Sequence, residues 1–422
     1  MKNAMPNRQV RKARGCCLYL SDGSVLIDAI SSWWCVIHGY NHPAMNQAAI
    51  SQINQVAHVM LGGLETQATR QLADKLVDIT PEGLNHVFFS DSGSVGVEVA
   101  LKMAIQYFQN KGNHQKKRFL FLEKAYHGDT TGAMSVCDPY DGMHVRFKDL
   151  LPQHIMADAP AMGFKADHHI LKRQLSDLEA LFKKHHRELA GIILEPILQV
   201  AGGFNIYSPV YLKRVKELAE AYHVLLICDE VATGFGRTGA LFASNWASIT
   251  PDIMVLGKGL TGGYFGLAAT LSTSEIFCSF YSDDPSKCFM HGPTFTGHAT
   301  ACACALKSIE LFEKGKYLSK IKEIESVLKS ELLQIESDNI QDIRVLGAGG
   351  VIEAKKAHML EGLQSYAIER GVWLRPFGKY VYTMPPYVIS NKELIQIIRV
   401  MKGWFLDSKR TATRTKVLGV GV

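Results

Sequence analysis

The chain has 422 residues, of which 47% are hydrophobic and 20% are charged, and its 46 Lys and Arg against 40 Asp and Glu give a formal net charge of +6. This length exceeds what one hydrophobic core usually serves, so we expect more than one domain. The composition is that of a folded protein, which excludes a small binding module and a disordered chain. Basic residues are scattered except near the two ends, which argues against a nucleic-acid-binding protein.

Cysteine and histidine usage bears on location and on metal binding. The nine cysteines include no Cys-x-x-Cys pair, which favours reduced thiols in a reducing compartment. No uninterrupted apolar run reaches the ~18 residues of a membrane span, and the N-terminal segment is polar and basic, unlike a signal peptide. The adjacent histidines His168 and His169 lie in charged surroundings. We therefore expect a cytoplasmic protein with no membrane segment and no metal site.

Strand and helix signals alternate through the middle of the chain. After the first apolar strand, at residues 86–90, apolar residues recur at helical spacing, so a helix is expected to begin near Ser94. The later strands are apolar on both faces, as strands are when helices cover both sides of a parallel sheet. The expected strands are residues 86–90, 118–122, 191–194, 224–228 and 253–256, with an amphipathic helix at 212–222.

The pattern changes past about residue 306. A long charged helix at residues 318–333 precedes short strands near 345–353 and 380–384, and a helix at 392–405 follows. This order indicates a second, smaller α+β domain beside a large α/β domain with a mostly parallel sheet. The predicted division is residues 1–44 as the N-terminal part of the small domain, 45–305 as the large domain and 306–422 as the C-terminal small domain.

Two glycine motifs point to nucleotide binding only weakly. Residues 234–239 match the string G-x-G-x-x-G, but they begin six residues after a strand ends at Cys228, and Pro251 interrupts the helix that a dinucleotide fold requires. Lys258 does not complete a P-loop, because Asp252 occupies the first glycine position of that motif. A nicotinamide oxidoreductase is therefore a distant alternative.

A carboxylate and a lysine follow two of the predicted strands. Asp229 comes just after the strand at 224–228, and Lys258 follows the strand at 253–256. Open α/β sheets bind ligands in a crevice at the carboxyl ends of their strands, so we expect both charges to point into it. On this observation alone, a buried ion pair explains the two residues equally well.

A polar turn and an aromatic residue indicate which kind of ligand this crevice binds. Residues 90–94, Ser-Asp-Ser-Gly-Ser, join a strand to a helix, where backbone N–H groups, hydroxyls and the helix dipole suit a phosphate. Tyr126 follows the strand at 118–122 and can add an aromatic ring. Together these groups describe a seat for pyridoxal phosphate, in which Lys258 forms a Schiff base and Asp229 keeps the pyridine nitrogen protonated.

Longer strings resemble a known family. Residues 229–239 and 251–259 resemble the signature of the class III aminotransferases, which are pyridoxal-phosphate-dependent transferases of fold type I. The resemblance runs from about residue 15 to about residue 398. Further strings are similar to the members of the family that serve biotin biosynthesis, at residues 31–43, 91–95, 289–295, 371–377 and 384–387.

The resemblance implies an activity and an assembly. The activity is transfer of an amino group from S-adenosylmethionine to 8-amino-7-oxononanoate, giving 7,8-diaminononanoate by a ping-pong mechanism, with lysine as the alternative donor. The assembly is a homodimer with shared active sites. Two other functions stay open at this point. One is another class III activity, an ω-amino acid aminotransferase or an aminomutase, and the other is a cofactor-binding homologue without catalysis.

The resemblance also assigns roles by position. Lys258, Asp229 and Tyr126 would be catalytic. The residues that would bind the cofactor are Gly93, Ser94, Tyr126, Asp229, Val231 and Lys258, together with Pro293 and Thr294, which would reach the phosphate in the neighbouring subunit. The residues that would bind substrate are Trp33, Trp34, Tyr126, Lys258, Gly292 and Arg375. Arg375 would take the carboxylate of the oxononanoate, because its planar fork can bind a carboxylate through two hydrogen bonds.

The chain departs from the family pattern in three places. Residues 298–301 read His-Ala-Thr-Ala where relatives commonly have Asn-Pro, and the segment after Phe405 resembles nothing in the family. Relatives also carry an N-terminal segment with a His-Pro-Tyr string, whose tyrosine enters the substrate site. This sequence lacks that string. We expect this difference to weaken substrate binding while cofactor binding stays intact. A start upstream of Met1 is the alternative.

Overall fold

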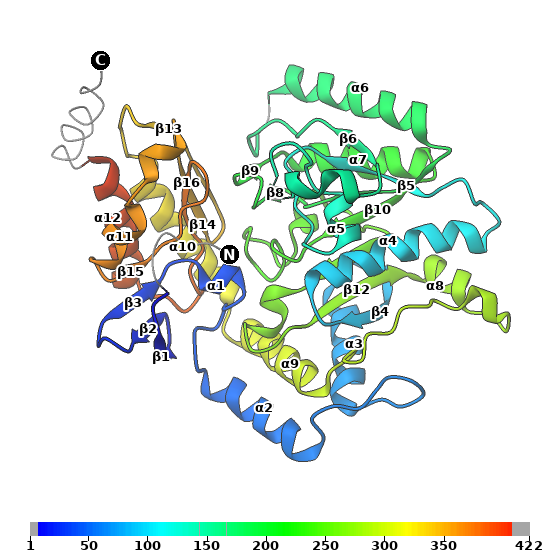
Figure 1. Ribbon diagram of the computed structural model, residues 1–422, viewed down its shortest axis with the longest axis horizontal. Coiled ribbons are helices and arrows are strands. Elements are labelled where there is room, and N and C mark those ends of the chain that lie inside the picture. Colours follow the sequence, from blue (N-terminus) through cyan, green and yellow to red (C-terminus); the bar gives the residue numbers. More distant parts are fainter. Residues whose placement is uncertain (1–6, 143, 166, 407–422) are drawn as a thin grey trace. The chain divides into compact units, whose positions relative to one another are not determined.

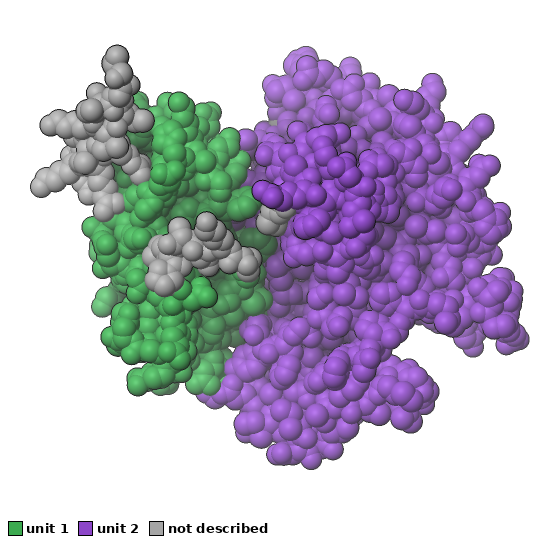
Figure 2. Space-filling model, in the orientation of Figure 1, with its two compact units in different colours: residues 1–42, 319–422 green, residues 43–318 purple. Residues whose placement is uncertain are grey.

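The computed structural model describes residues 7–142, 144–165 and 167–406. The chain divides into two compact units, which Figure 2 colours separately: residues 1–42 with 319–422, and residues 43–318. Each unit has sheets of its own. Among the described helices, none is both long enough and apolar enough to cross a membrane.

The second unit, residues 43–318, is built on a seven-stranded sheet. Strand β12 runs antiparallel to both of its neighbours, whereas the other neighbouring strands are parallel to each other. The expected mostly parallel sheet of an α/β protein is therefore confirmed. In sheet order the strands are β4 (Leu84–Ser90), β12 (Ala268–Thr273), β11 (Ile253–Leu256), β10 (Leu225–Asp229), β7 (Leu189–Leu194), β5 (Arg118–Leu122) and β6 (Ile155–Ala157).

Apolar residues on both faces of the central strands produce this sheet. Ile193 in β7, Ile227 in β10 and Val255 in β11 are fully buried in one cluster. Helix α4 (Gly93–Asn110) contributes Val97 and Ala104 to the same cluster and runs along β11 and β12 (Figure 1). Parallel strands covered on both faces need this continuous apolar character, and the sequence pattern predicted it for the same reason.

The remaining helices of the second unit connect and cover the strands. Helix α9 packs against α2 and α3. A small antiparallel pair, β8 (Leu198–Gln199) with β9 (Asn205–Ile206), lies between β7 and α7 in the sequence. The helices are α2 (Pro43–Gln55), α3 (Gln67–Ile79), α5 (Thr131–Ser135), α6 (His168–His185), α7 (Pro209–Ala221), α8 (Ser274–Phe280) and α9 (Ala299–Lys314), with 3-10 turns at Val145–Leu150, Ala243–Ala247, Lys258–Thr261 and Pro285–Lys287.

The first unit, residues 1–42 and 319–422, combines two small sheets with helices. Strand β3 pairs in parallel with β15, Ile27 opposite Val372, and this pairing ties the N-terminal segment to the C-terminal part of the unit. One sheet is β1 (Val10–Arg14), β2 (Cys17–Leu20), β3 (Val25–Asp28) and β15 (Val372–Trp373), and the other is β13 (Ile340–Leu346), β14 (Gly349–Ala354) and β16 (Tyr380–Thr383). The helices are α1 (Ser31–Trp34), α10 (Tyr317–Leu332), α11 (Leu363–Ile368) and α12 (Asn391–Leu406), with a 3-10 turn at Ala357–Leu360.

The glycine string at residues 234–239 lies in a series of turns, not at the start of a helix. Gly236 and Gly239 have φ angles of 95° and 97°, and the next regular element is the short 3-10 turn Ala243–Ala247. A dinucleotide site needs a helix whose N-terminus faces the pyrophosphate directly after these glycines. The structure therefore agrees with the rejection of a dinucleotide-binding motif.

Candidate active site

Polar residues collect at the carboxyl ends of the parallel strands in the second unit. Asp229 is the last residue of β10, and Glu195 directly follows β7. Lys258 comes two residues after β11 ends, and Val255 of β11 is paired with Asp229. Because parallel strands end at one edge of the sheet, the chain brings these side chains together at that edge.

The Asp229 carboxylate is held by two partners. His127 Nδ1 lies 2.8 Å from Asp229 Oδ2, where the imidazole donates to the carboxylate, and the backbone N–H of Val231 donates to Oδ1 at 3.0 Å. Asp229 is 5% exposed and the His127 side chain is fully buried. His127 Nε2 has no hydrogen-bond partner within the part of the chain that the structure describes. The carboxylate therefore has a fixed rotation and a buried imidazole behind it.

Glu195 is a second buried carboxyl group beside the first. Its two oxygens accept hydrogen bonds from the backbone N–H groups of Tyr126 and Val200, both at 3.2 Å. Burial, and then the charge of Asp229, raise the pKa of Glu195 to about 8, and the positive charge of Lys258 opposes that rise. A neutral Glu195 at pH 7 holds the Tyr126 backbone without adding a second negative charge.

Tyr126 presents an aromatic ring close to these carboxyl groups. The ring stacks on His144 with centroids 5.7 Å apart, and the hydroxyl donates to Asp129 Oδ1 at 3.0 Å. Burial, together with the nearby Asp129, raises the pKa of Tyr126, so the hydroxyl stays protonated. We call Tyr126, His127, Glu195, Asp229 and Lys258 the strand-end cluster.

The polar turn before α4 packs against this cluster. Ser92 caps the helix by accepting from Val95 N–H at 3.3 Å, and Ser94 Oγ accepts from the N–H groups of Asp129 and Thr130, each at 2.9 Å. The loop that follows Tyr126 is thereby bound to the first turn of α4. Gly128 in that loop has a φ of 129°, and a Cβ there would clash with Ser94.

Glycine is also required at the start of α4. A Cβ on Gly93 would lie 2.7 Å from Val231 Cγ1, so only glycine allows the turn and Val231 to approach this closely. A Cβ on Gly257, next to Lys258, would lie 3.3 Å from Cγ1 of the same valine and 3.7 Å from the Cα of Gly93. The structure therefore brings together Gly93, Ser94, Val231 and the strand-end cluster.

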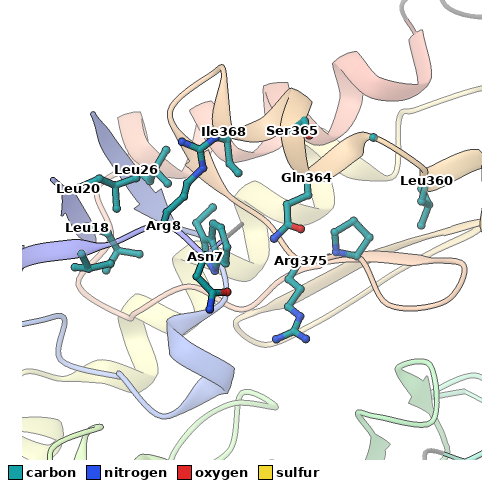
Figure 3. A pocket seen from close by; sticks show the side chains of 14 residues that line it. Asn7, Arg8, Leu18, Leu20, Leu26, Leu360, Gln364, Ser365, Ile368 and Arg375 are labelled. Carbon is teal, nitrogen blue, oxygen red and sulfur yellow. The ribbon is translucent and has the colours of Figure 1, made fainter. Parts of the chain in front are cut away.

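The predicted substrate residues of the first unit also contact each other. The Arg375 guanidinium lies 4.8 Å from the centre of the Trp33 ring, and Trp34 meets Tyr382 edge-on at 6.4 Å. Arg375 is part of the wall of a cavity of about 770 Å³ within this unit. Figure 3 shows the guanidinium groups of Arg375 and Arg8 pointing in opposite directions.

Residues 292–294 lie outside the helices and strands of the second unit, in the segment that precedes α9. Gly292 and Thr294 are exposed, and the Thr294 carbonyl accepts from His58 Nε2 at 2.8 Å. The Pro293 carbonyl accepts from Thr296 N–H at 3.0 Å. These contacts are made within the chain, and the predicted approach of Pro293 and Thr294 to a neighbouring subunit stays a prediction.

Comparison with known proteins identifies the family. Residues 1–404 match the class-III aminotransferases. The chain is 44% identical to an adenosylmethionine-8-amino-7-oxononanoate aminotransferase of Buchnera aphidicola, over 93% of this chain and 91% of that protein. It is 40% identical to the Saccharomyces cerevisiae protein of the same name, over 93% and 90%. The chain therefore belongs to the class-III aminotransferases.

Solved structures agree with this assignment. The adenosylmethionine-8-amino-7-oxononanoate aminotransferase of Methanocaldococcus jannaschii superposes with a TM-score of 0.88 at 33% identity, covering 96% of this chain and 94% of that one. An omega transaminase of Pseudomonas jessenii in complex with PMP gives a TM-score of 0.89 at 25% identity, covering 97% and 96%. The chain thus has the fold of the pyridoxal-phosphate-dependent transferases of fold type I, as the sequence predicted.

Pyridoxal phosphate is the cofactor of this family, and the residues present fit it. The side chain required for a pyridine nitrogen is a buried carboxylate of fixed rotation, and Asp229 provides it. A phosphate requires a helix N-terminus that lacks an obstructing side chain, and α4 begins at Gly93. Lys258 supplies the amine.

Two residues of the cluster were missed by the sequence analysis. Glu195 directly follows an apolar strand, much as Asp229 ends one, but the sequence analysis assigned it no role. The rule of strand ends applied to Asp229 would also have found Glu195. His127 stands next to Tyr126, yet its partner Asp229 is 102 residues away, so no local pattern reveals the pair.

Proposed function

We propose that the protein transfers an amino group from S-adenosylmethionine to 8-amino-7-oxononanoate and forms 7,8-diaminononanoate, a step of biotin biosynthesis. Relatives at 40% to 44% identity over about nine-tenths of the chain carry the name of this aminotransferase. The observation that carries the substrate assignment is the contact of Arg375 with Trp33. A guanidinium lying on an aromatic ring suits an acceptor that has a carboxylate at the end of an aliphatic chain.

The cofactor residues in this proposal come from the strand-end cluster and the turn before α4. Asp229 would accept the N–H of the pyridine ring, with His127 and Val231 N–H holding the carboxylate in place. Tyr126 and Val231 would lie against the ring. Gly93 and Ser94 would receive the phosphate at the N-terminus of α4.

Proton movement falls to the residues of the cluster. When bound, pyridoxal phosphate takes up the amino group and delocalises the electron pair released at the substrate carbon. Lys258 Nζ would remove the proton from that carbon and deliver it to the carbon on the other side of the transferred nitrogen. Asp229 keeps the proton on the pyridine nitrogen, while the neutral carboxyl of Glu195 leaves the local charge to Asp229 alone. The Tyr126 hydroxyl stays protonated, and it would donate a hydrogen bond to substrate in place of its bond to Asp129.

The acceptor is recognised by the remaining predicted residues. Arg375 would bind the carboxylate of the oxononanoate through two parallel hydrogen bonds. Trp33 and Trp34 would form an apolar wall for its aliphatic chain, with Gly292 contributing backbone.

The working form in this proposal is a homodimer with shared sites. Thr294 is exposed in the single chain, and with Pro293 it would reach the cofactor phosphate of a second copy. Cofactor binding and association are then linked. Sedimentation at decreasing protein concentration should show that Thr294→Ala weakens both dimerisation and cofactor retention. A monomer that retains cofactor tightly would contradict the shared site.

We place the protein in the cytoplasm. All nine cysteines are free thiols, five of them buried, which fits a reducing compartment.

The function is tested by supplying the acceptor with each donor in turn. The purified protein, reconstituted with pyridoxal phosphate, is incubated with 8-amino-7-oxononanoate and either S-adenosylmethionine or lysine, and the diamine is quantified. Diamine from S-adenosylmethionine supports the proposal. Diamine formed only from lysine would correct the donor, and no diamine from either donor would contradict the proposed function.

A further inference from the structure

The short element α1 (Ser31–Trp34) is a single left-handed turn whose backbone L-amino acids disfavour. Ser31, Ser32, Trp33 and Trp34 have φ angles of 50°, 45°, 56° and 77°, so four consecutive residues without a glycine lie in the left-handed region. This region is disfavoured because Cβ comes too close to a carbonyl oxygen. Such a conformation persists only where surrounding contacts hold it.

Asp28, the last residue of β3, accepts three hydrogen bonds beside this turn, one of them from a backbone N–H of the turn itself. Its Oδ1 accepts from Ile30 N–H at 2.9 Å, and its Oδ2 accepts from Ser32 N–H at 2.9 Å. The Tyr40 hydroxyl donates to the same Oδ2 at 2.6 Å. Asp28 is only 1% exposed, so the three donors compensate a buried carboxylate. Burial, and then the charge of Asp28, raise the pKa of Tyr40, which keeps its hydroxyl protonated and donating.

The same segment is bound to the end of β16. Ser31 Oγ donates to the Met384 carbonyl at 2.7 Å. The Ala29 carbonyl accepts from Thr383 Oγ1 and from Met384 N–H, both at 2.8 Å. These bonds hold the start of the turn, whereas the Asp28 carboxylate binds the backbone N–H of Ile30, just before the turn, and that of Ser32 within it.

The turn carries the aromatic pair that contacts Arg375. The Trp33 ring is half-exposed, and the Arg375 guanidinium rests 4.8 Å from its centre. A cation–π contact of this kind depends on the position of the ring face. A change in the backbone at Ser32 would rotate the Trp33 ring and remove the surface on which Arg375 lies.

We propose that Asp28 is a positioning residue for acceptor recognition: by holding the left-handed turn, its carboxylate sets the Trp33 ring and, through the ring, the Arg375 guanidinium. The inference rests on the proposed function, in which Arg375 binds the carboxylate of the acceptor. It assigns specificity to a buried residue that does not itself touch substrate. Tyr40 assists by donating to the same carboxylate oxygen.

Kinetics of the holoenzyme test the proposal. Asp28→Asn replaces one carboxylate oxygen by an NH₂ group that cannot accept, and we expect the KM for the acceptor to rise about tenfold. Tyr40→Phe removes the hydrogen bonds of the Tyr40 hydroxyl to Asp28 Oδ2 and to Ser32 Oγ, and should raise that KM about threefold. The rate of the donor half-reaction should stay unchanged in both variants. Asp22→Asn, an exposed carboxylate of the same unit, is the matched control and should leave both half-reactions unchanged.

A rescue variant separates positioning from a general loss of structure. Glycine adopts the left-handed region without a Cβ penalty, so Ser32→Gly should restore part of the acceptor affinity lost in Asp28→Asn. Equal slowing of both half-reactions in Asp28→Asn and in Tyr40→Phe would overturn the proposal. A double variant with no recovery would also overturn it.

Near-ultraviolet circular dichroism tests the same claim without activity. The Trp33 contribution is the difference between the spectra of the holoenzyme and its Trp33→Phe variant. We expect this difference to disappear in the Asp28→Asn background and to persist in the Asp22→Asn background. An unchanged Trp33 contribution in Asp28→Asn would overturn the positioning role. A wild-type enzyme that forms no diamine would instead contradict the proposed function, and the spectra alone would then decide the role of Asp28.

Discussion

The strand-end cluster and the turn at residues 31–34 differ in what positions their side chains. Asp229 ends a regular strand, and its neighbour Lys258 follows another, so the sheet itself sets their location. Trp33 stands on a left-handed backbone that is held by the buried carboxylate of Asp28. We therefore expect activity to fall most when the reacting groups of the cluster are substituted. In the turn, we expect acceptor binding to depend also on residues that do not touch substrate.

The largest effect is expected at the amine of the cluster. Lys258→Ala should lower turnover by about 10²–10⁴-fold or more, because no group remains to move the proton between carbon atoms. Rapid-mixing measurement of both half-reactions in the reconstituted protein checks this. Lys213→Ala, an exposed lysine on α7, is the control. Turnover of Lys258→Ala at the wild-type rate would remove Lys258 from the mechanism.

His127→Phe should have the next largest effect. It removes a hydrogen bond to a buried carboxylate, a loss of about 1.5–3 kcal/mol, so both half-reactions should slow by about ten- to a hundredfold. The measurement is kcat/KM for donor and for acceptor, with exposed His114→Ala as the control. An effect on the acceptor half-reaction alone would show that His127 acts on recognition, and the contrast between the two regions would then fail.

Arg375→Ala tests acceptor recognition, the function that we assign to the region around the turn. Loss of a charge-assisted pair of about 1.5–3 kcal/mol should weaken apparent acceptor affinity about ten- to a hundredfold while leaving the donor half-reaction unchanged. Arg399→Ala, exposed on α12, is the matched control. Equal weakening of both half-reactions would show that Arg375 does not read the acceptor carboxylate.

The smallest effect concerns the reactivity of cysteine thiols near the two regions. Cys137 accepts from His127 N–H at 3.1 Å beside the cluster, and burial raises its pKa to about 12. Below its pKa this thiol remains protonated, with a thiolate fraction under about 10⁻³ at pH 8. Iodoacetamide at pH 8 followed by mass spectrometry should modify exposed Cys278 and half-buried Cys35, which directly follows the turn, and leave Cys137 intact. Rapid modification of Cys137 would show that the cluster opens to solvent.

General rules of sheet architecture predicted the cluster better than the turn. Asp229 and Lys258 could be found because strands that are buried on both faces are visible in the sequence, and ligands bind where such strands end. The pairing of His127 with Asp229 could not be found, because it joins the loop after β5 to the last residue of β10.

The turn has no local signal of its conformation. Residues 31–34 contain neither glycine nor asparagine, the residues that usually mark a left-handed backbone. Its conformation depends on the buried carboxylate of Asp28 and on Met384, a residue 353 positions from Ser31. The resemblance to the family found Trp33 and Trp34, whereas only the structure shows what holds them.

The most direct test of the central claim follows the nitrogen atom. The holoenzyme is incubated with S-adenosylmethionine labelled with nitrogen-15 at its amino group and with unlabelled 8-amino-7-oxononanoate, and the product is analysed by mass spectrometry. The account predicts diamine that carries one labelled nitrogen, and none in the Lys258→Ala variant. Unlabelled diamine, or the absence of diamine, would contradict it.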